Sequence, residues 1–199
     1  MKLGVHVPLV LLASLTLLFS GCSGNGGSIS SVDLRSESIS VDQATLLKSF
    51  KSKHLYCPGE NISGDLLLKN RFEAVVLYEN KVVNDHVTGL MWQQDEVPEQ
   101  FGWKEAEVYL ADINSSEFAG YSDWRIPSTE ELASLLIPRK NDAGYLDPVF
   151  HKEILSTWTC DEFPDMPAGA WFVDFFEGKP VDGNRAAGLG QVRLVRSFQ

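Results

Sequence analysis

The order of hydrophobic patterns along the chain constrains its fold more than any other feature. Apolar and β-branched residues fill short runs at 72–78, 81–83 and 87–92, with a polar turn at 79–80. These runs predict a hairpin followed by a third strand. Between Trp103 and Ile113 apolar residues recur every three or four positions, which predicts an amphipathic helix.

A second helix is predicted after Pro127. Ser128 is a typical N-cap residue, and Glu131 completes a capping box ahead of a leucine-rich stretch, which we expect Pro138 to end. Three further β-type runs follow at 156–160, 170–175 and 192–198. Strands, two helices and strands, in that order, predict an α+β domain with a mainly antiparallel sheet.

The first 21 residues have the pattern of an export signal, with Lys2 ahead of an apolar stretch from Val7 to Phe19. The sequence Leu-Phe-Ser-Gly-Cys at 18–22 resembles the bacterial lipobox, in which the chain is cut before a cysteine that becomes lipid-modified. Several acyl chains on Cys22 give stable anchoring, since each buried methylene contributes ~0.8 kcal/mol. The alternatives are an ordinary signal peptide and an uncleaved membrane anchor.

Residues 22–40 are rich in Gly and Ser and nearly free of aromatic residues, so we expect a flexible tether ahead of a domain at 41–199. The formal charge of the chain is −10, and removal of residues 1–21 leaves 16 basic against 27 acidic residues, a charge of −11. This acidity argues against nucleic acid as a partner.

Five blocks of the expected domain share the pattern of one known family. They are VTGLMW at 87–92, WKEA at 103–106, GYSDWRIPSTEEL at 120–132, AWFVDF at 170–175 and VRLVR at 192–196. Over residues 71–197 the chain resembles the Lcl C-terminal domain family, named after the C-terminal domain of the Legionella collagen-like adhesin. The resemblance implies a C-type-lectin-like fold and a surface adhesin or display function. Ser23, after the lipobox cysteine, resembles the residue that permits outer-membrane sorting of Gram-negative lipoproteins.

The chain departs from the family at its cysteines and at the calcium motifs of C-type lectins. Leu110 and Leu194 stand where family members often have cysteines, and the calcium motifs are absent, so calcium-dependent sugar binding is not inherited. Cys57 and Cys160 are the cysteines left after lipidation, and export favours a disulfide between them. Closing a loop of about a hundred residues would stabilise the fold by ~4.7 kcal/mol.

Two segments predicted as loops, 161–168 and 178–190, carry the candidate ligand-binding residues, since loops on a rigid scaffold often carry recognition. In a lectin-like domain these loops would meet on one ligand face, although both could equally be solvated connections. The candidates are Glu162, Phe163, Asp165, Asp182, Asn184 and Arg185. A calcium ion would find carboxylate ligands in Asp161, Glu162, Asp165 and Asp182, but no EF-hand spacing supports it, so no metal or cofactor is predicted.

Other conspicuous side chains have structural explanations. Trp92, Trp103, Trp124 and Trp171 suit sugar stacking, but their place in the shared blocks favours the core. Asp123 and Arg125 favour a structural clamp, in which the carboxylate accepts backbone amides and the guanidinium pairs nearby. The common hydrolase, metalloprotease and P-loop motifs are absent, so we do not expect an enzyme.

The sequence therefore predicts a lipid-anchored envelope protein that displays a non-catalytic binding domain for a protein or glycan ligand. The net charge disfavours sulfated glycosaminoglycans, because the only late basic cluster consists of Lys179, Arg185, Arg193 and Arg196. The alternative is an envelope scaffold or assembly protein that forms a homo-oligomer and has no ligand in solution.

Overall fold

The computed structural model describes residues 31–59, 67–95, 99–142, 144–150, 156–166 and 168–198. The predicted signal peptide and Cys22 lie outside these residues. The helices are α1 (Gln43–Ser52), α2 (Trp103–Ser115), η2 (Phe118–Gly120, a 3-10 turn) and α3 (Thr129–Ala133). The strands are β1 (Phe72–Leu77), β2 (Asn80–Asp85), β3 (Leu90–Gln93), β4 (Leu136–Asn141), β5 (Gly144–Leu146), β6 (Ser156–Glu162), β7 (Gly169–Asp174), β8 (Lys179–Asn184) and β9 (Val195–Ser197).

Residues 72–93 supply three strands of a four-stranded antiparallel sheet with the order β1-β2-β3-β9. The predicted hairpin and third strand are its first three strands. The fourth strand comes from the end of the chain, because Trp92 of β3 pairs with Val195 of β9. The sheet therefore joins residues 72–93 to residues 195–197.

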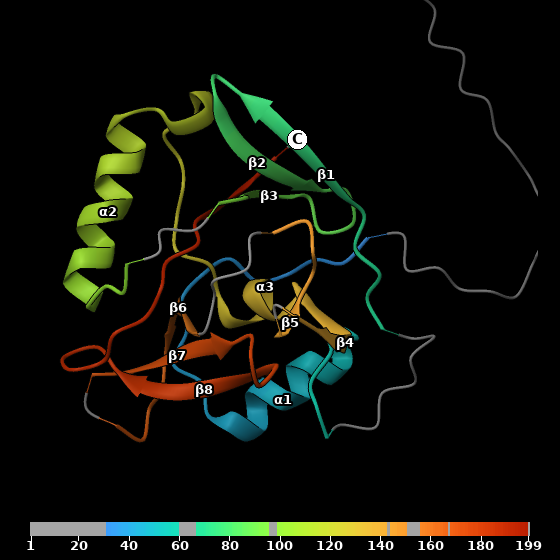
Figure 1. The fold of residues 1–199 in the computed structure, drawn as a ribbon. Coiled ribbons are helices and arrows are strands. Elements are labelled where there is room, and N and C mark those ends of the chain that lie inside the picture. The colour runs from blue at the N-terminus through green and yellow to red at the C-terminus, as the bar shows by residue number, and fades with distance from the viewer. Residues whose placement is uncertain are drawn as a thin grey trace, which may run out of the picture.

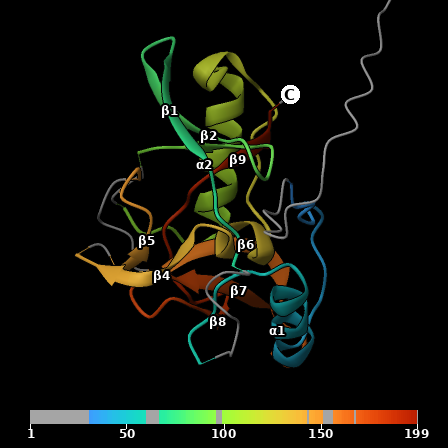
Figure 2. The same ribbon diagram turned by 90° about the vertical axis from the view of Figure 1, so that its right-hand side faces the viewer.

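A second, three-stranded antiparallel sheet has the order β6-β7-β8, and β4 and β5 form a separate pair. The four-stranded sheet lies at the top of the molecule in Figure 1, the three-stranded sheet lies at the bottom, and α3 lies between them. The view in Figure 2 shows the same layering, with α1 beside the lower sheet. The predicted α+β class with mainly antiparallel sheets is confirmed.

Alternating side chains of the four-stranded sheet belong to two apolar clusters. Val83, Trp92 and Val195 belong to a cluster with residues of α1, α3 and β7. Val82 and Met91 belong to a second cluster, which includes residues of α2 and the loop after η2. Since neighbouring residues of a strand point to opposite faces, one sheet contributes to both halves of the core.

The tryptophans follow the predicted preference for the core, with one partial exception. Trp92, Trp124 and Trp171 are almost completely buried. Trp103 is half-buried, and its ring packs edge-on against Trp158 at a centroid distance of 5.4 Å. Their burial leaves the first three unable to act as exposed platforms for a sugar.

The helices agree with the sequence in part. The predicted helix at 103–113 is α2, and the capping box of Ser128 and Glu131 is present at the start of α3. However, α3 ends at Ala133, and Pro138 lies inside β4 rather than after a helix. Helix α1, capped by the Asp42 side chain, was not predicted.

Residues 31–40, which we call the N-terminal strap, correct the predicted tether. Leu34 is buried in the first apolar cluster, and the Val32 amide donates to the Val87 carbonyl at 3.2 Å. Ser40 forms a parallel bridge with Glu162 at the end of β6. The folded domain therefore begins before Val41, because side chains of the strap belong to its core.

Candidate functional site

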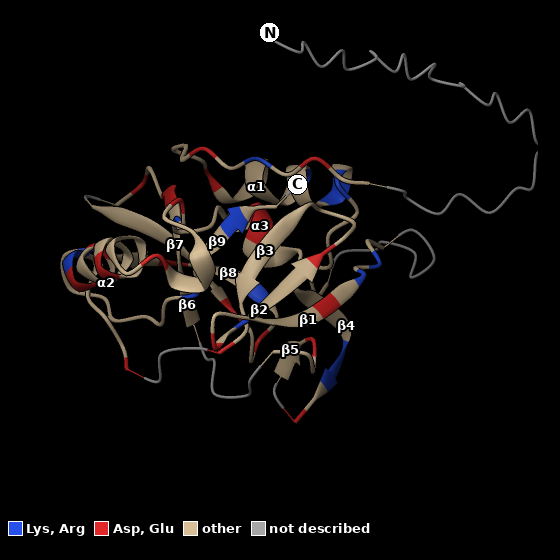
Figure 3. Ribbon diagram, turned by 90° about the horizontal axis from the view of Figure 1, so that it is seen from above, with Lys and Arg blue, Asp and Glu red and all other residues tan. Residues whose placement is uncertain are grey.

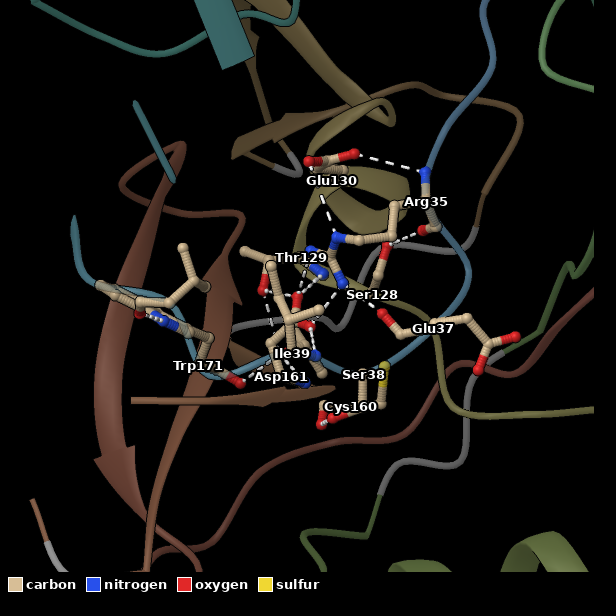
Figure 4. A network of polar contacts seen from close by, with 12 residues as sticks. Arg35, Glu37, Ser38, Ile39, Ser128, Thr129, Glu130, Cys160, Asp161 and Trp171 are labelled. Carbon is tan, nitrogen blue, oxygen red and sulfur yellow. Dashed lines mark hydrogen bonds and ion pairs between the residues drawn. The ribbon is translucent and has the colours of Figure 1, made fainter. Parts of the chain in front are cut away.

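The strap is joined to the domain by Asp161, whose side chain is completely buried. The two carboxylate oxygens accept hydrogen bonds from Arg35 Nη1 and Nη2 at 2.6 and 2.8 Å. They also accept from the Ile39 amide at 3.0 Å and from the amide and hydroxyl of Thr129 at 2.9 and 2.8 Å. Figure 4 shows these groups converging on one carboxylate. We call this network the Asp161 hub.

Charge and hydrogen bonding keep the Asp161 carboxylate ionised. Burial alone raises its pKa, but the hydrogen bonds from Arg35, Thr129 and Ile39 outweigh burial and hold the pKa below its usual value. On the other side of Arg35 lies Glu130, 3.8 Å from its Nε. Glu130 is also 3.5 Å from the Lys53 ammonium, so the hub continues to the end of α1.

The hub engages Asp161, one of the four carboxylates that the sequence offered as possible calcium ligands. Both of its oxygens are engaged by Arg35 and backbone amides, and a cation would have to displace them. Within the described part of the chain, no group of three or more His, Cys, Asp or Glu side chains is placed to hold a metal ion. Asp161 therefore has a structural function.

A hollow of about 290 Å³, which we call the β6 hollow, lies directly beyond the hub. It is lined by Ser40, Glu162, Phe163, Pro164, Met166, Ala168, Gly169 and Arg185. At its edge, Arg185 Nη1 lies 3.5 Å from Glu162 Oε1. The Glu162 side chain is 56% exposed, so its carboxylate can reach a ligand while paired with the guanidinium.

Arg185 is held from two sides. Its guanidinium carbon lies 4.0 Å above the Trp103 ring, a cation–π contact with helix α2. Its Nη2 donates to the Cys160 carbonyl at 2.8 Å, and its backbone amide donates to the Ala168 carbonyl at 2.8 Å. These contacts fix a positive charge at the hollow, which lowers the entropy lost on binding.

The structure brings together three of the six candidate residues, since Glu162, Phe163 and Arg185 line the same hollow. The half-buried Phe163 packs edge-on against Trp171 at 5.1 Å, so part of its ring belongs to the core. The hollow also contains Ser40, which sequence reasoning assigned to the tether. The Ser40–Glu162 bridge joins positions far apart in the chain, so no local pattern indicates it.

The other three candidates do not line the β6 hollow. Asp165 is exposed on the loop after β6. Asp182 and Asn184 lie on β8, so the segment predicted as a loop at 178–190 begins as a strand. Asn184 Oδ1 accepts the Ala186 amide at 2.7 Å, which gives this side chain a role in the turn after β8.

The two cysteines do not form the expected disulfide in the structure. Cys57 belongs to the first apolar cluster, whereas Cys160 packs against the second. Burial and the neighbouring Asp161 raise the pKa of the Cys160 thiol to about 12. A thiol that stays protonated at neutral pH is a poor nucleophile.

The residues on either side of Trp124 are paired, as the clamp interpretation predicts. The Arg125 guanidinium forms two bonds to Glu131, at 2.5 and 2.7 Å. The Asp123 carboxylate pairs with Arg196 at 2.7 and 3.1 Å, so its partner is a side chain of β9 rather than the expected backbone amides.

Comparison with known proteins identifies the family of the domain. The model of the Lcl C-terminal domain matches residues 81–196, more than half of the chain. The matched region runs from β2 to β9 and includes Glu162 and Arg185. No curated protein matches the chain. Among the described residues, no helix has the length and apolar character needed to cross a membrane. The chain belongs to the Lcl C-terminal domain family, a family of adhesin-associated domains.

Proposed function

We propose that this protein displays an adhesin-type, non-catalytic binding domain in the bacterial cell envelope and binds a protein or glycan ligand through the β6 hollow. The observation that carries the proposal is the convergence of Glu162 and Arg185, two candidates from different segments, at the edge of one hollow. Lipid on Cys22 anchors the protein, and Ser23 permits its sorting to the outer membrane.

The chemistry of the hollow supports binding rather than catalysis. A carboxylate accepts hydrogen bonds from a ligand, a guanidinium donates them, and the partly exposed Phe163 offers apolar contact. Because Glu162 and Arg185 compensate each other, the hollow suits a ligand that carries both donors and acceptors. The neighbouring Cys160 has a raised pKa and supplies no activated nucleophile.

The test is an array of glycans and host surface proteins probed with a fragment that begins at Ser31, so that the strap is retained. Glu162→Gln removes the negative charge of the pair, whereas Arg185→Lys keeps the positive charge but loses the planar guanidinium and its several donors. We expect either change to weaken binding about tenfold. Asp165→Asn, an exposed acid outside the hollow, is the matched control and should bind normally.

Two results would contradict the proposal. The first is equal binding by all four proteins, which would place the ligand elsewhere. The second is failure of the folded fragment to bind any target on the array. A stable homo-oligomer that survives the same substitutions would, in the second case, support the envelope-scaffold alternative.

A further inference from the structure

The four-stranded sheet carries a second hollow, away from the residues assigned to ligand binding above. Its volume is about 530 Å³, within the range of roughly 300–1,000 Å³ that is typical of small-molecule sites. Strands β1, β2, β3 and β9 all contribute to it, as does the loop after η2 through Tyr121 and Asp123. We call it the sheet hollow.

Strand register explains why polar and apolar groups meet there. Asn84 of β2 lies opposite Met91 of β3, and Met91 lies opposite Arg196 of β9. Residues paired in this way project from the same face of a sheet, so the three side chains form one row across three strands. Val75 and Leu77 of β1 add apolar surface beside the row.

One side of the sheet hollow carries a fixed and electrically neutral pair. Arg196 Nε and Nη2 donate to the two oxygens of Asp123, and the guanidinium carbon lies 3.7 Å above the Tyr121 ring. The Arg196 side chain is only 13% exposed, whereas Asp123 is 63% exposed. The carboxylate is therefore held in place while it remains accessible to hydrogen-bond donors from solution.

The Asn84 amide supplies an unused acceptor. Its Oδ1 is buried and accepts no hydrogen bond from any residue in the described part of the chain. A buried polar atom without a partner destabilises the fold, so a hydroxyl that reaches it would gain more than one that meets a solvated group. Because Asn84 is one of the residues that line the hollow, a bound molecule is a suitable donor.

We propose that the sheet hollow binds one neutral sugar ring. The C–H face of the ring would lie on the partly exposed Val75 and Leu77. Its hydroxyls would donate to Asp123 and, once the Asn84 amide turns toward the ring, to Oδ1 of Asn84. A neutral ring suits this hollow better than an anion, since Arg196 is already compensated and Asp123 repels negative charge. The site is separate from the β6 hollow, so the proposal for one hollow can be wrong while the proposal for the other holds.

Saturation-transfer NMR on the full-length protein in detergent micelles tests this site. The probes are glucose, galactose, mannose and N-acetylglucosamine, with glucuronate as the anionic comparison. We expect at least one neutral sugar to receive saturation at its ring C–H protons. Val75→Trp places an indole over the hollow on a strand that tolerates aromatic residues, and should abolish this signal.

Asp123→Asn gives a sharper test, because it replaces the carboxylate by a neutral amide and leaves the positive charge of Arg196 uncompensated. We expect neutral sugar to bind about tenfold more weakly, since a charge-assisted hydrogen bond is lost, and glucuronate to bind more tightly than to the parent protein. Asp112→Asn, the same change at an exposed position of α2, is the control and should alter neither affinity.

The proposal is wrong if no neutral sugar receives saturation from the folded parent protein. It is equally wrong if the signal persists in the Val75→Trp protein, because the ring would then lie elsewhere. If the Asp112→Asn control also lost neutral-sugar binding, the effect of Asp123→Asn would come from the change in net charge alone. That result would also show that the proposal is wrong. If binding on the array depends on Glu162 but not on Asp123, the β6 hollow is a binding site even when the proposal for the sheet hollow fails.

Discussion

At the scale of single residues, Asp161 is the buried charge on which the packing of the strap depends. Its carboxylate is the counter-ion of Arg35, and both side chains are largely withdrawn from solvent. Removing Asp161 leaves the Arg35 charge without its closest counter-ion, with only Glu130 at 3.8 Å. We therefore expect Asp161→Asn to lower the free energy of unfolding at pH 7 by about 3 kcal/mol, as measured by urea denaturation.

The pH dependence of this effect has a defined sign. The pKa of Asp161 is lower in the folded than in the unfolded state, so its contribution is fully present above the unfolded-state value of about 3.9. That contribution is lost as the pH falls through the folded-state pKa. The difference between parent and Asp161→Asn should therefore be largest near neutral pH and shrink in acid. Asp165 is exposed, so Asp165→Asn should leave the free energy of unfolding unchanged at neutral and at acid pH. If it changed the free energy as much as Asp161→Asn does, the effect could not be assigned to the buried Asp161 carboxylate.

At the scale of elements, the parts of the fold that the sequence predicts are those with local signals. The capping box of Ser128 and the apolar period of α2 each depend on residues a few positions apart in the chain, and both are present. Strand β8 has no such signal, because Pro180 and Gly183 interrupt its pattern. It forms through pairing with β7, in which Val181 lies opposite Phe172.

The strap was missed for a similar reason. Its Gly- and Ser-rich surroundings resemble a linker, and its attachment depends on Leu34 and Arg35, whose partners lie in distant parts of the chain. The same limit applies to the β6 hollow. Its Glu162 and Arg185 were predicted from loop chemistry, whereas Ser40 joins them only through tertiary pairing.

The strap gives a prediction at this scale. A fragment that begins at Val41 lacks Arg35 and the Ile39 amide, and should be less stable than one that begins at Ser31 by about 3 kcal/mol. In the shorter fragment Asp161→Asn should cost little, because the carboxylate no longer has a counter-ion to lose. Urea denaturation of the two fragments, each with and without Asp161→Asn, gives the coupling energy between the strap and Asp161 directly. The same penalty for Asp161→Asn in both fragments would show that the strap does not act through the hub.

At the scale of the whole molecule, charge decides which polymers can approach. Acidic and basic residues are interspersed over the elements (Figure 3), and the chain carries a formal charge of −10. The late basic residues do not form an open patch. Arg193 is completely buried, while Arg185 and Arg196 pair with Glu162 and Asp123. A sulfated polymer would therefore meet compensated cations and a repulsive net field.

We therefore expect the protein to pass through a heparin column at physiological salt without retention. At this ionic strength charges are screened over about 8 Å, so only local basic clusters could bind the polymer. The exposed pairs Lys48 and Lys51 of α1 and Arg139 and Lys140 of β4 are each too small to release many counter-ions. As a control, Glu162→Lys and Asp123→Lys together should produce weak, salt-sensitive retention by exposing Arg185 and Arg196. Retention of the parent protein would show instead that a local basic surface outweighs the net charge, and Lys48→Glu with Lys51→Glu would then test α1 as that surface.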